Sequence, residues 1–150
     1  MNRLTVSALA LMLVAGVAAG ADAQTKTVTV NMTEAHEVPP HQGSGAGTAT
    51  LILDPATKSV SWKVTWQGLS STAIMAHIHG PASPTANAGV QVNLASKDLK
   101  MGDPLPNPLE GKATLTDAQW TDLMAGKDYI NVHTTNNKGG EIRGQIAPQM

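Results

Sequence analysis

Residues 59–66 read SVSWKVTW and alternate without interruption between polar and apolar side chains. Successive side chains of an extended strand point to opposite faces of a sheet, so both valines and both tryptophans would share one face. A strand with one apolar and one polar face is typical of an antiparallel sheet that covers a core on one side. The stretch therefore predicts a half-buried β-strand.

The same period of two recurs along much of the chain. Further strands are expected around four groups of alternating apolar residues: Val28/Val30/Met32, Ala49/Leu51/Leu53, Val90/Val92/Leu94 and Ile142/Ile146. Turn-forming residues separate these groups at the spacing of antiparallel strands. The expected fold is all-β, an antiparallel, Greek-key-like β-sandwich. The segments richest in Pro and Gly, residues 81–89 and 102–111, are expected to be long loops.

One short helix is expected to interrupt the strands. Thr116 and Gln119 have the spacing of a capping box, in which each side chain bonds the backbone N–H of the other residue. Leu115 precedes the cap as a hydrophobic staple, and Gly126 has the position of a helix stop. The sequence therefore predicts a helix between Thr116 and Gly126.

The first 23 residues have the pattern of a secretory signal peptide. A basic start with Arg3 precedes an apolar run over residues 4–20, and an Ala-x-Ala site ends at Ala23. Residues 24–150 are then expected to form one domain. Their apolar runs are shorter than the ~20 residues that cross a bilayer, so no membrane span is expected after signal removal. We expect the protein in the periplasm or outside the cell.

Charge, cysteine content and motifs exclude several function classes. The net charge is −1, and removal of residues 1–23 leaves it unchanged because Arg3 and Asp22 are lost together. A chain without a basic excess is not expected to bind nucleic acid. The sequence has no cysteine, which excludes disulfides and thiol chemistry. It also lacks the Ser-His-Asp, phosphate-loop and HExxH patterns, so hydrolase chemistry is not supported.

Three histidines form the candidate site. His77 and His79 are two residues apart and would project from one face of a strand, on either side of a buried Ile78. His133 lies in a second strand-like run, residues 129–134. Imidazole suits copper and zinc, so the three side chains are predicted to bind copper, with zinc as the competing ion. Alternatively, the imidazoles bond loop backbone and act as structural pins.

Other side chains can reach the same site. His36 and His41 flank the run Glu37-Val38-Pro39-Pro40, whose extended path can carry either imidazole toward the cluster as a fourth ligand. Met75 shares the strand face of His77 and offers a soft thioether to Cu(I), or else packs apolar surface.

The strand of residues 129–134 and a following strand of residues 141–147 are expected to form a hairpin that brings two charged residues beside His133. For Val132 and Ile142 of these strands to share the core face, the register must set His133 opposite Glu141 or Arg143. Glu141 would then orient an imidazole as a hydrogen-bond acceptor behind the metal, and Arg143 would attract an anionic ligand. An ordinary cross-strand ion pair is the alternative role for each of these two residues.

Four blocks of the sequence resemble the CHRD domain, which is named after the repeated modules of the animal protein chordin. In the order of the family they are EVPP (37–40), AHIHGPA (76–82), YINVHT (129–134) and GEIRGQI (140–146). The resemblance spans nearly the whole chain after residue 23. It implies an extracytoplasmic β-rich domain, with a cell-envelope or extracellular protein as the expected partner.

The histidine pattern is also similar to the copper site of copper/zinc superoxide dismutase. That site uses an HxH pair on a strand and a later strand histidine, which here would be His77, His79 and His133. Arg143 lies in a Gly-rich block like the arginine that guides superoxide to copper. The similarity implies a superoxide-dismutase-like sandwich. The chain departs from the dismutase in having no histidine between His79 and His133, so the bridging ligand is missing and no catalytic residue is assigned.

Two functions are consistent with these patterns. The first is a secreted or periplasmic CHRD-domain protein that binds a copper ion through the strand histidines. The second is a non-catalytic extracellular module that binds another protein and uses the histidines structurally. Uptake of metal by the purified chain distinguishes them.

Overall fold

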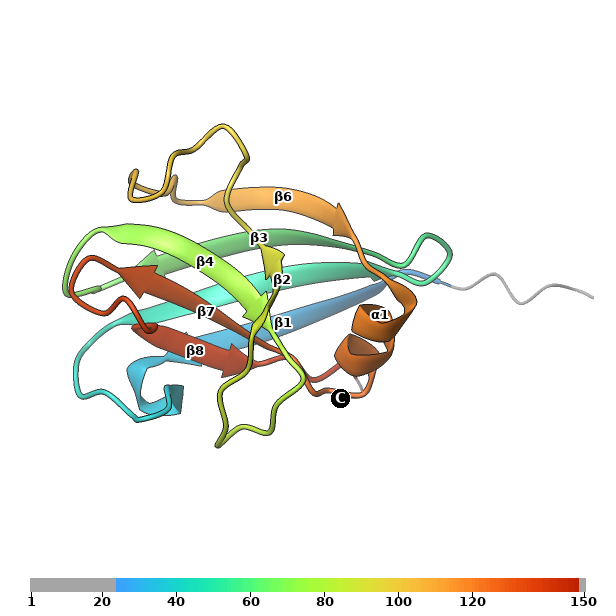
Figure 1. The fold of residues 1–150 in the computed structure, drawn as a ribbon, viewed down its shortest axis with the longest axis horizontal. Helices are drawn as coiled ribbons and strands as arrows, with labels where there is room; N and C mark the ends of the chain where they lie inside the picture. The colour runs from blue at the N-terminus through green and yellow to red at the C-terminus, as the bar shows by residue number, and fades with distance from the viewer. Residues whose placement is uncertain (1–23, 149–150) are drawn as a thin grey trace, which may run out of the picture.

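The structure, a computed structural model, describes residues 24–148; the predicted signal peptide lies outside this range. All paired strands are antiparallel. The all-β prediction is therefore confirmed (Figure 1). The elements are β1 (Lys26–Thr33), the 3-10 helix η1 (Glu34–His36), β2 (Ala46–Asp54), β3 (Ser59–Gln67), β4 (Ala73–His79), β5 (Val90–Asn93), β6 (Leu109–Thr114), α1 (Asp117–Met124), β7 (Tyr129–Thr134) and β8 (Ile142–Gln145).

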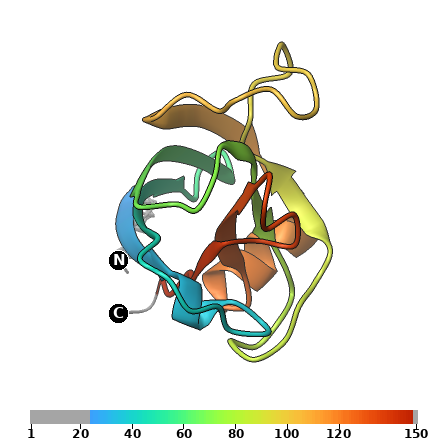
Figure 2. The ribbon, with the colours of Figure 1, turned by 90° about the vertical axis from the view of Figure 1, so that its left-hand side faces the viewer.

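The eight strands form one sheet in the order β5-β4-β7-β8-β1-β2-β3-β6. The sheet curls until it is nearly closed (Figure 2). In the described residues β1 joins β8 through one register pair, Thr33 with Arg143, so this seam divides the sheet into two four-stranded halves. The halves enclose one hydrophobic cluster. Strands that are distant in sequence lie side by side, β4 with β7 and β1 with β8, as the predicted Greek-key-like sandwich requires.

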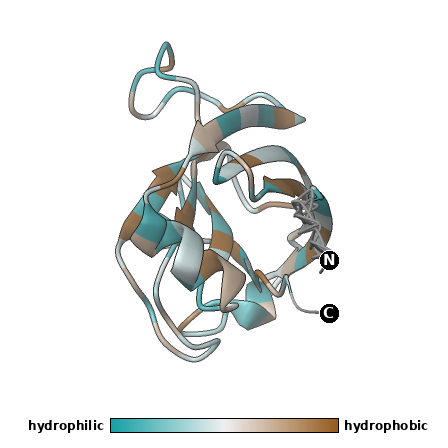
Figure 3. Cartoon of the chain, turned by 90° about the vertical axis from the view of Figure 1, so that its right-hand side faces the viewer, coloured by the Kyte–Doolittle hydropathy of each residue, from teal (hydrophilic) through white to brown (hydrophobic). Residues whose placement is uncertain are grey.

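The core follows the predicted alternation. Val60 and Val64 are fully buried and Trp62 is nearly so, whereas the lysine between them, Lys63, is exposed. Brown and teal bands accordingly alternate along the strands in Figure 3. Each fully buried valine, leucine or isoleucine contributes about 1.5–3 kcal/mol relative to an exposed one, which makes this face the main source of stability.

The helix α1 begins and ends where the sequence predicts. Thr116 Oγ1 accepts from the Gln119 backbone N–H at 3.3 Å, and Gln119 Oε1 accepts from the Thr116 N–H at 2.9 Å. Gly126 follows with φ of +71°, a left-handed conformation that glycine adopts without strain. Leu123 is buried, so the helix covers one end of the sandwich (Figure 1). Among residues 24–148 no helix has the length and apolar character to cross a bilayer.

The prediction of a loop over residues 102–111 was wrong at its C-terminal end, where β6 begins at Leu109. β6 pairs with β3 and places Gly111 opposite Trp62. The strand escapes detection because its sequence, LEGKAT, has only one fully buried apolar residue. Gly111 is needed at this position because an added Cβ would lie 2.5 Å from a ring carbon of Trp62.

The predicted loop between β4 and β5 is fixed at its base by a buried carboxyl group. Asp128 lies just before β7 and is 1% exposed, and its Oδ1 accepts from Gln91 Nε2 at 3.2 Å. The Ala82 N–H donates to the Lys127 carbonyl at 2.7 Å. Burial, with a further contribution from Asp122, raises the pKa of Asp128 to about 7. The loop therefore rests on a carboxyl group that gains its charge only near neutral pH.

The substitution Gly111→Ala is expected to lower the free energy of unfolding by about 1–3 kcal/mol, because the added methyl group would overlap the Trp62 ring. Gly89→Ala is the matched control, since nothing lies within 4 Å of its Cβ position. Urea unfolding of the two variants measures the difference. Equal stability would contradict the packing of β6 against Trp62.

Because its pKa is raised, Asp128 is predicted to lower the free energy of unfolding as the pH rises. From about pH 4 to about pH 7 the unfolded chain releases this proton while the folded chain retains it, so folding becomes less favourable. Asp128→Asn keeps the acceptor for Gln91 and removes the titration. The stability gained by this variant should grow over that interval and level off above it at no more than about 4 kcal/mol.

Chemical denaturation at several pH values measures this gain. Asp98→Asn, which removes an exposed carboxylate, serves as the control. A gain for Asp128→Asn that is the same at about pH 4 and about pH 8 would contradict the assignment.

Candidate metal centre

The structure brings His77, His79 and His133 together on the face of β4 and β7 that points away from the core. One ring nitrogen from each histidine lies within 4.8 Å of the others. Ile78 is 1% exposed on the opposite face, as the alternation predicts. Neighbouring strands therefore place three imidazoles at distances that a small closure of their side chains would bring onto one ion.

Backbone carbonyl groups orient two of the three imidazoles. Nδ1 of His79 lies 3.0 Å from the Ala88 oxygen, and Nδ1 of His133 lies 2.9 Å from the Lys138 oxygen. A ring nitrogen that faces a carbonyl oxygen carries the hydrogen, so the lone pair of each neutral ring is on Nε2. Metal-binding histidines are typically oriented in this way.

Ring nitrogens of the cluster lie close together. Nδ1 of His77 lies 3.0 Å from Nε2 of His133, and since that Nε2 carries the lone pair of its ring, the His77 nitrogen donates to it. Nε2 of His79 is buried and makes no hydrogen bond of normal geometry, and the side chain of Asn131 is the polar group that interacts with this ring. A buried nitrogen without a partner is costly, and it is the atom that a cation at this point would satisfy.

The electrostatic environment keeps the three rings neutral. Burial, followed by the proximity of His133 and His79, lowers the pKa of His77 to about 4. Burial is also the main cause of the lowered pKa values of His79 and His133. At neutral pH the imidazoles therefore have lone pairs available, as metal ligands must.

A stack of three side chains supports one edge of the cluster. The rings of His79 and Tyr129 are stacked, with centroids 5.0 Å apart and planes within 5°. The guanidinium carbon of Arg143 lies 3.4 Å from the centroid of the Tyr129 ring. Because β7 lies between β4 and β8, Tyr129 separates the histidine from the arginine. The stack fixes the His79 ring and places a cation near the cluster.

The loop over residues 80–89 covers this polar face. Arg143 donates to the carbonyl oxygens of Ser83 and Ala86 at 3.2 and 2.8 Å and to Asn87 Oδ1 at 3.0 Å. Asn87 Nδ2 donates in turn to the Val38 oxygen at 2.7 Å, which ties the loop to the segment after η1. Every residue of β7 is buried as a result, although the alternation alone predicts one polar face in solvent.

Glu141 supports the neighbouring turns rather than a histidine ring. Its carboxylate accepts from the Ser70 N–H and from the side chains of Ser70, Thr134 and Asn137. Burial alone would raise the pKa of Glu141, but these hydrogen bonds outweigh burial and lower it. The alternative role in an ion pair is not found, because neither Glu141 nor Arg143 takes part in the ion pairs of residues 24–148.

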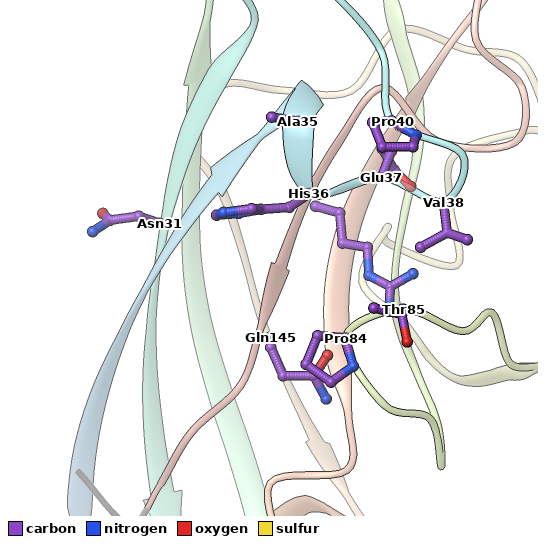
Figure 4. Close-up of a pocket in the computed structure, with 10 residues that line it drawn as sticks. Asn31, Ala35, His36, Glu37, Val38, Pro40, Pro84, Thr85 and Gln145 are labelled. Atoms are coloured by element: carbon purple, nitrogen blue, oxygen red, sulfur yellow. The ribbon is translucent and has the colours of Figure 1, made fainter.

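His36 and His41 lie outside the three-histidine cluster. Nε2 of His41 lies 3.1 Å from the Gly140 oxygen. His36 lines a separate cavity of about 560 Å³ together with Glu37 and Arg143 (Figure 4). Burial raises the pKa of Glu37, and the charge of Arg143 partly offsets this effect. The extended path through the prolines therefore brings the two histidines to the covering segment and not to the cluster.

Sequence reasoning missed the groups that hold the cluster. Tyr129 had a signal, because it shares the strand face of His133 in the run YINVHT. The carbonyl groups of Ala88 and Lys138 had none, since any residue type supplies a carbonyl oxygen and only the loop path brings it to a ring.

Comparison with known proteins identifies the family. The family model of the CHRD domain matches residues 28–146, which include the three histidines and most of the chain. No curated protein and no solved structure gave a match. The extent of the match shows that the chain belongs to the CHRD-domain family.

Proposed function

We propose that this CHRD domain is an extracytoplasmic copper-binding protein whose ligands are His77, His79 and His133. The observation that carries the proposal is the buried Nε2 of His79, which makes no hydrogen bond of normal geometry, in a cluster whose three rings each place one nitrogen within 4.8 Å of the others. Zinc is the competing ion. CHRD domains are of an extracellular type, which fits export by the predicted signal peptide to the periplasm or the exterior.

A purely structural role accounts for part of the geometry only. The bonds from Nδ1 of His79 and His133 to carbonyl oxygens would suit structural pins equally well. Leaving Nε2 of His79 buried and unpaired costs about 1–3 kcal/mol. A purely structural role for the ring does not compensate for this cost. Coordination of an ion at Nε2 removes this cost, so metal binding explains both nitrogens of the ring.

Copper is favoured over zinc by the chemistry of the donor set. The cluster consists of neutral imidazoles, and neither a thiolate nor a carboxylate belongs to it. For nitrogen donors of this kind the affinity of divalent ions reaches its maximum at Cu(II) and is lower for Zn(II). Both ions would therefore bind, copper more tightly.

Arg143 and Glu141 would affect the proposed centre indirectly, by holding the residues and the loop around it in place. Arg143 holds the covering loop and stacks on Tyr129, which in turn stacks on His79. Glu141 fixes Thr134, the residue next to His133. Neither side chain contacts the three histidine rings directly in the hydrogen bonds of the described residues, so both would tune the rings and not bind the ion.

Replacing both strand histidines, in His77→Ala/His79→Ala, is expected to abolish uptake of about one Cu(II) ion per chain, because one imidazole remains of three. Isothermal titration of metal-free protein measures uptake, and circular dichroism checks the fold. The matched control is His36→Ala/His41→Ala, which removes two histidines outside the cluster and should bind copper like the wild type.

Two results would contradict the proposal. Equal copper uptake by the wild type and by His77→Ala/His79→Ala would refute the ligand assignment. If the wild type takes up neither copper nor zinc, the histidines are structural pins, and the function is that of a protein-interaction module.

A further inference from the structure

We infer that the centre binds copper as Cu(I), which enters through a cavity lined by two methionines. Met75 would be a thioether ligand of the ion, and Met101 the first residue that the entering ion contacts. The inference rests on the proposed copper function and adds the oxidation state and the route of the ion. Its parts are the register of β4 with β7, a cavity beside His77, and an exposed methionine at the rim of that cavity.

The sheet places Met75 beside His77 on β4 and opposite His133 on β7. Met75 precedes His77 by two residues on β4 and so shares its face, and it is the cross-strand partner of His133 on β7. Directly opposed residues of an antiparallel pair have Cβ atoms about 4.5–5.5 Å apart. The long, unbranched side chain of Met75 is only partly buried and is within reach of an ion held by these rings.

A cavity of about 290 Å³ opens beside the cluster, between β4 and the segment after β5. Met75, His77 and Met101 line it, so a histidine at the edge of the centre borders the same space as two methionines. The residues that line this cavity include no carboxylate, and Lys100 is the one charged side chain among them. A lining of this kind lacks the oxygen anions that attract hard cations and offers soft, uncharged donors.

Met101 has no packing role that would account for it. It is 94% exposed, compared with 46% for Ile52 and 55% for Val90, the other large hydrophobic residues exposed in the described chain. Hydrogen bonds between Lys100 and Asp103 close the turn that presents it, with the Asp103 N–H donating to the Lys100 oxygen at 3.0 Å. The thioether is thus held in solvent at the rim of the cavity by an ordered turn.

The donor set favours Cu(I) over the divalent ions. Thioether sulfur is a soft ligand that stabilises Cu(I), whereas Zn(II) and Cu(II) gain little from it. Met75 would therefore add affinity for Cu(I) alone.

The substitution Met75→Leu tests the inference, because leucine keeps the volume and apolar character and removes the sulfur. We expect about a tenfold to hundredfold loss of Cu(I) affinity, measured without oxygen by competition with a chromophoric Cu(I) chelator. Affinities for Cu(II) and Zn(II) should stay within about twofold. Met101→Leu should slow Cu(I) uptake in stopped-flow mixing, with the equilibrium affinity nearly unchanged. Met124→Leu, on α1 and outside the cavity lining, is the control for losing a methionine.

The outcomes separate this inference from the proposed function. Wild-type Cu(I) affinity in Met75→Leu, or wild-type protein that binds Cu(II) or Zn(II) but not Cu(I), would overturn the inference and leave the copper centre in place. An uptake rate unchanged by Met101→Leu would overturn the role of that residue. If the wild type binds none of the three ions, both proposals fail.

Discussion

The structure depends on one constraint, which is that a polar sheet face buried beneath a loop must find partners for its hydrogen-bonding groups. The outer face of β4, β7 and β8 presents imidazole, phenol, amide and guanidinium groups, and the loop over residues 80–89 covers them. Backbone carbonyls of that loop meet Arg143 and His79. A loop that buries polar groups stabilises the native state only if most of these groups make hydrogen bonds. A buried polar group without a hydrogen bond therefore needs an explanation.

The domain therefore has two buried layers, one held together by apolar burial and the other by hydrogen bonds. The apolar layer lies between the two halves of the sandwich and supplies stability through burial. The polar layer lies outside the sheet and supplies definite geometry, because each hydrogen bond fixes a direction as well as a distance. β7 belongs to both layers, with Ile130 and Val132 on one side and Tyr129 and His133 on the other. The strand that completes the core therefore also sets the spacing of the candidate ligands.

Much of this arrangement follows from the sequence. The period of two identified most of the strands, the capping box located α1, and the His-x-His pair with His133 identified the side chains that meet. Two features could not be read in this way. β6 has too little apolar character to be distinguished from a loop, because it is an edge strand that packs mainly through Leu109. The cover of the outer face depends on where the backbone of a long loop travels, and alternation records only which residues share a face.

The seam of the sandwich has a mechanical consequence. In residues 24–148 Arg143 forms, with Thr33, the one register pair between β1 and β8, and the same residue holds the loop above the histidines. Because the loop is bonded to the guanidinium of a residue at the seam, separation of the two halves and release of the loop are expected to be coupled. Amide exchange in β8 would report on both. Arg143 thus links the seam of the sheet to the loop above the histidines.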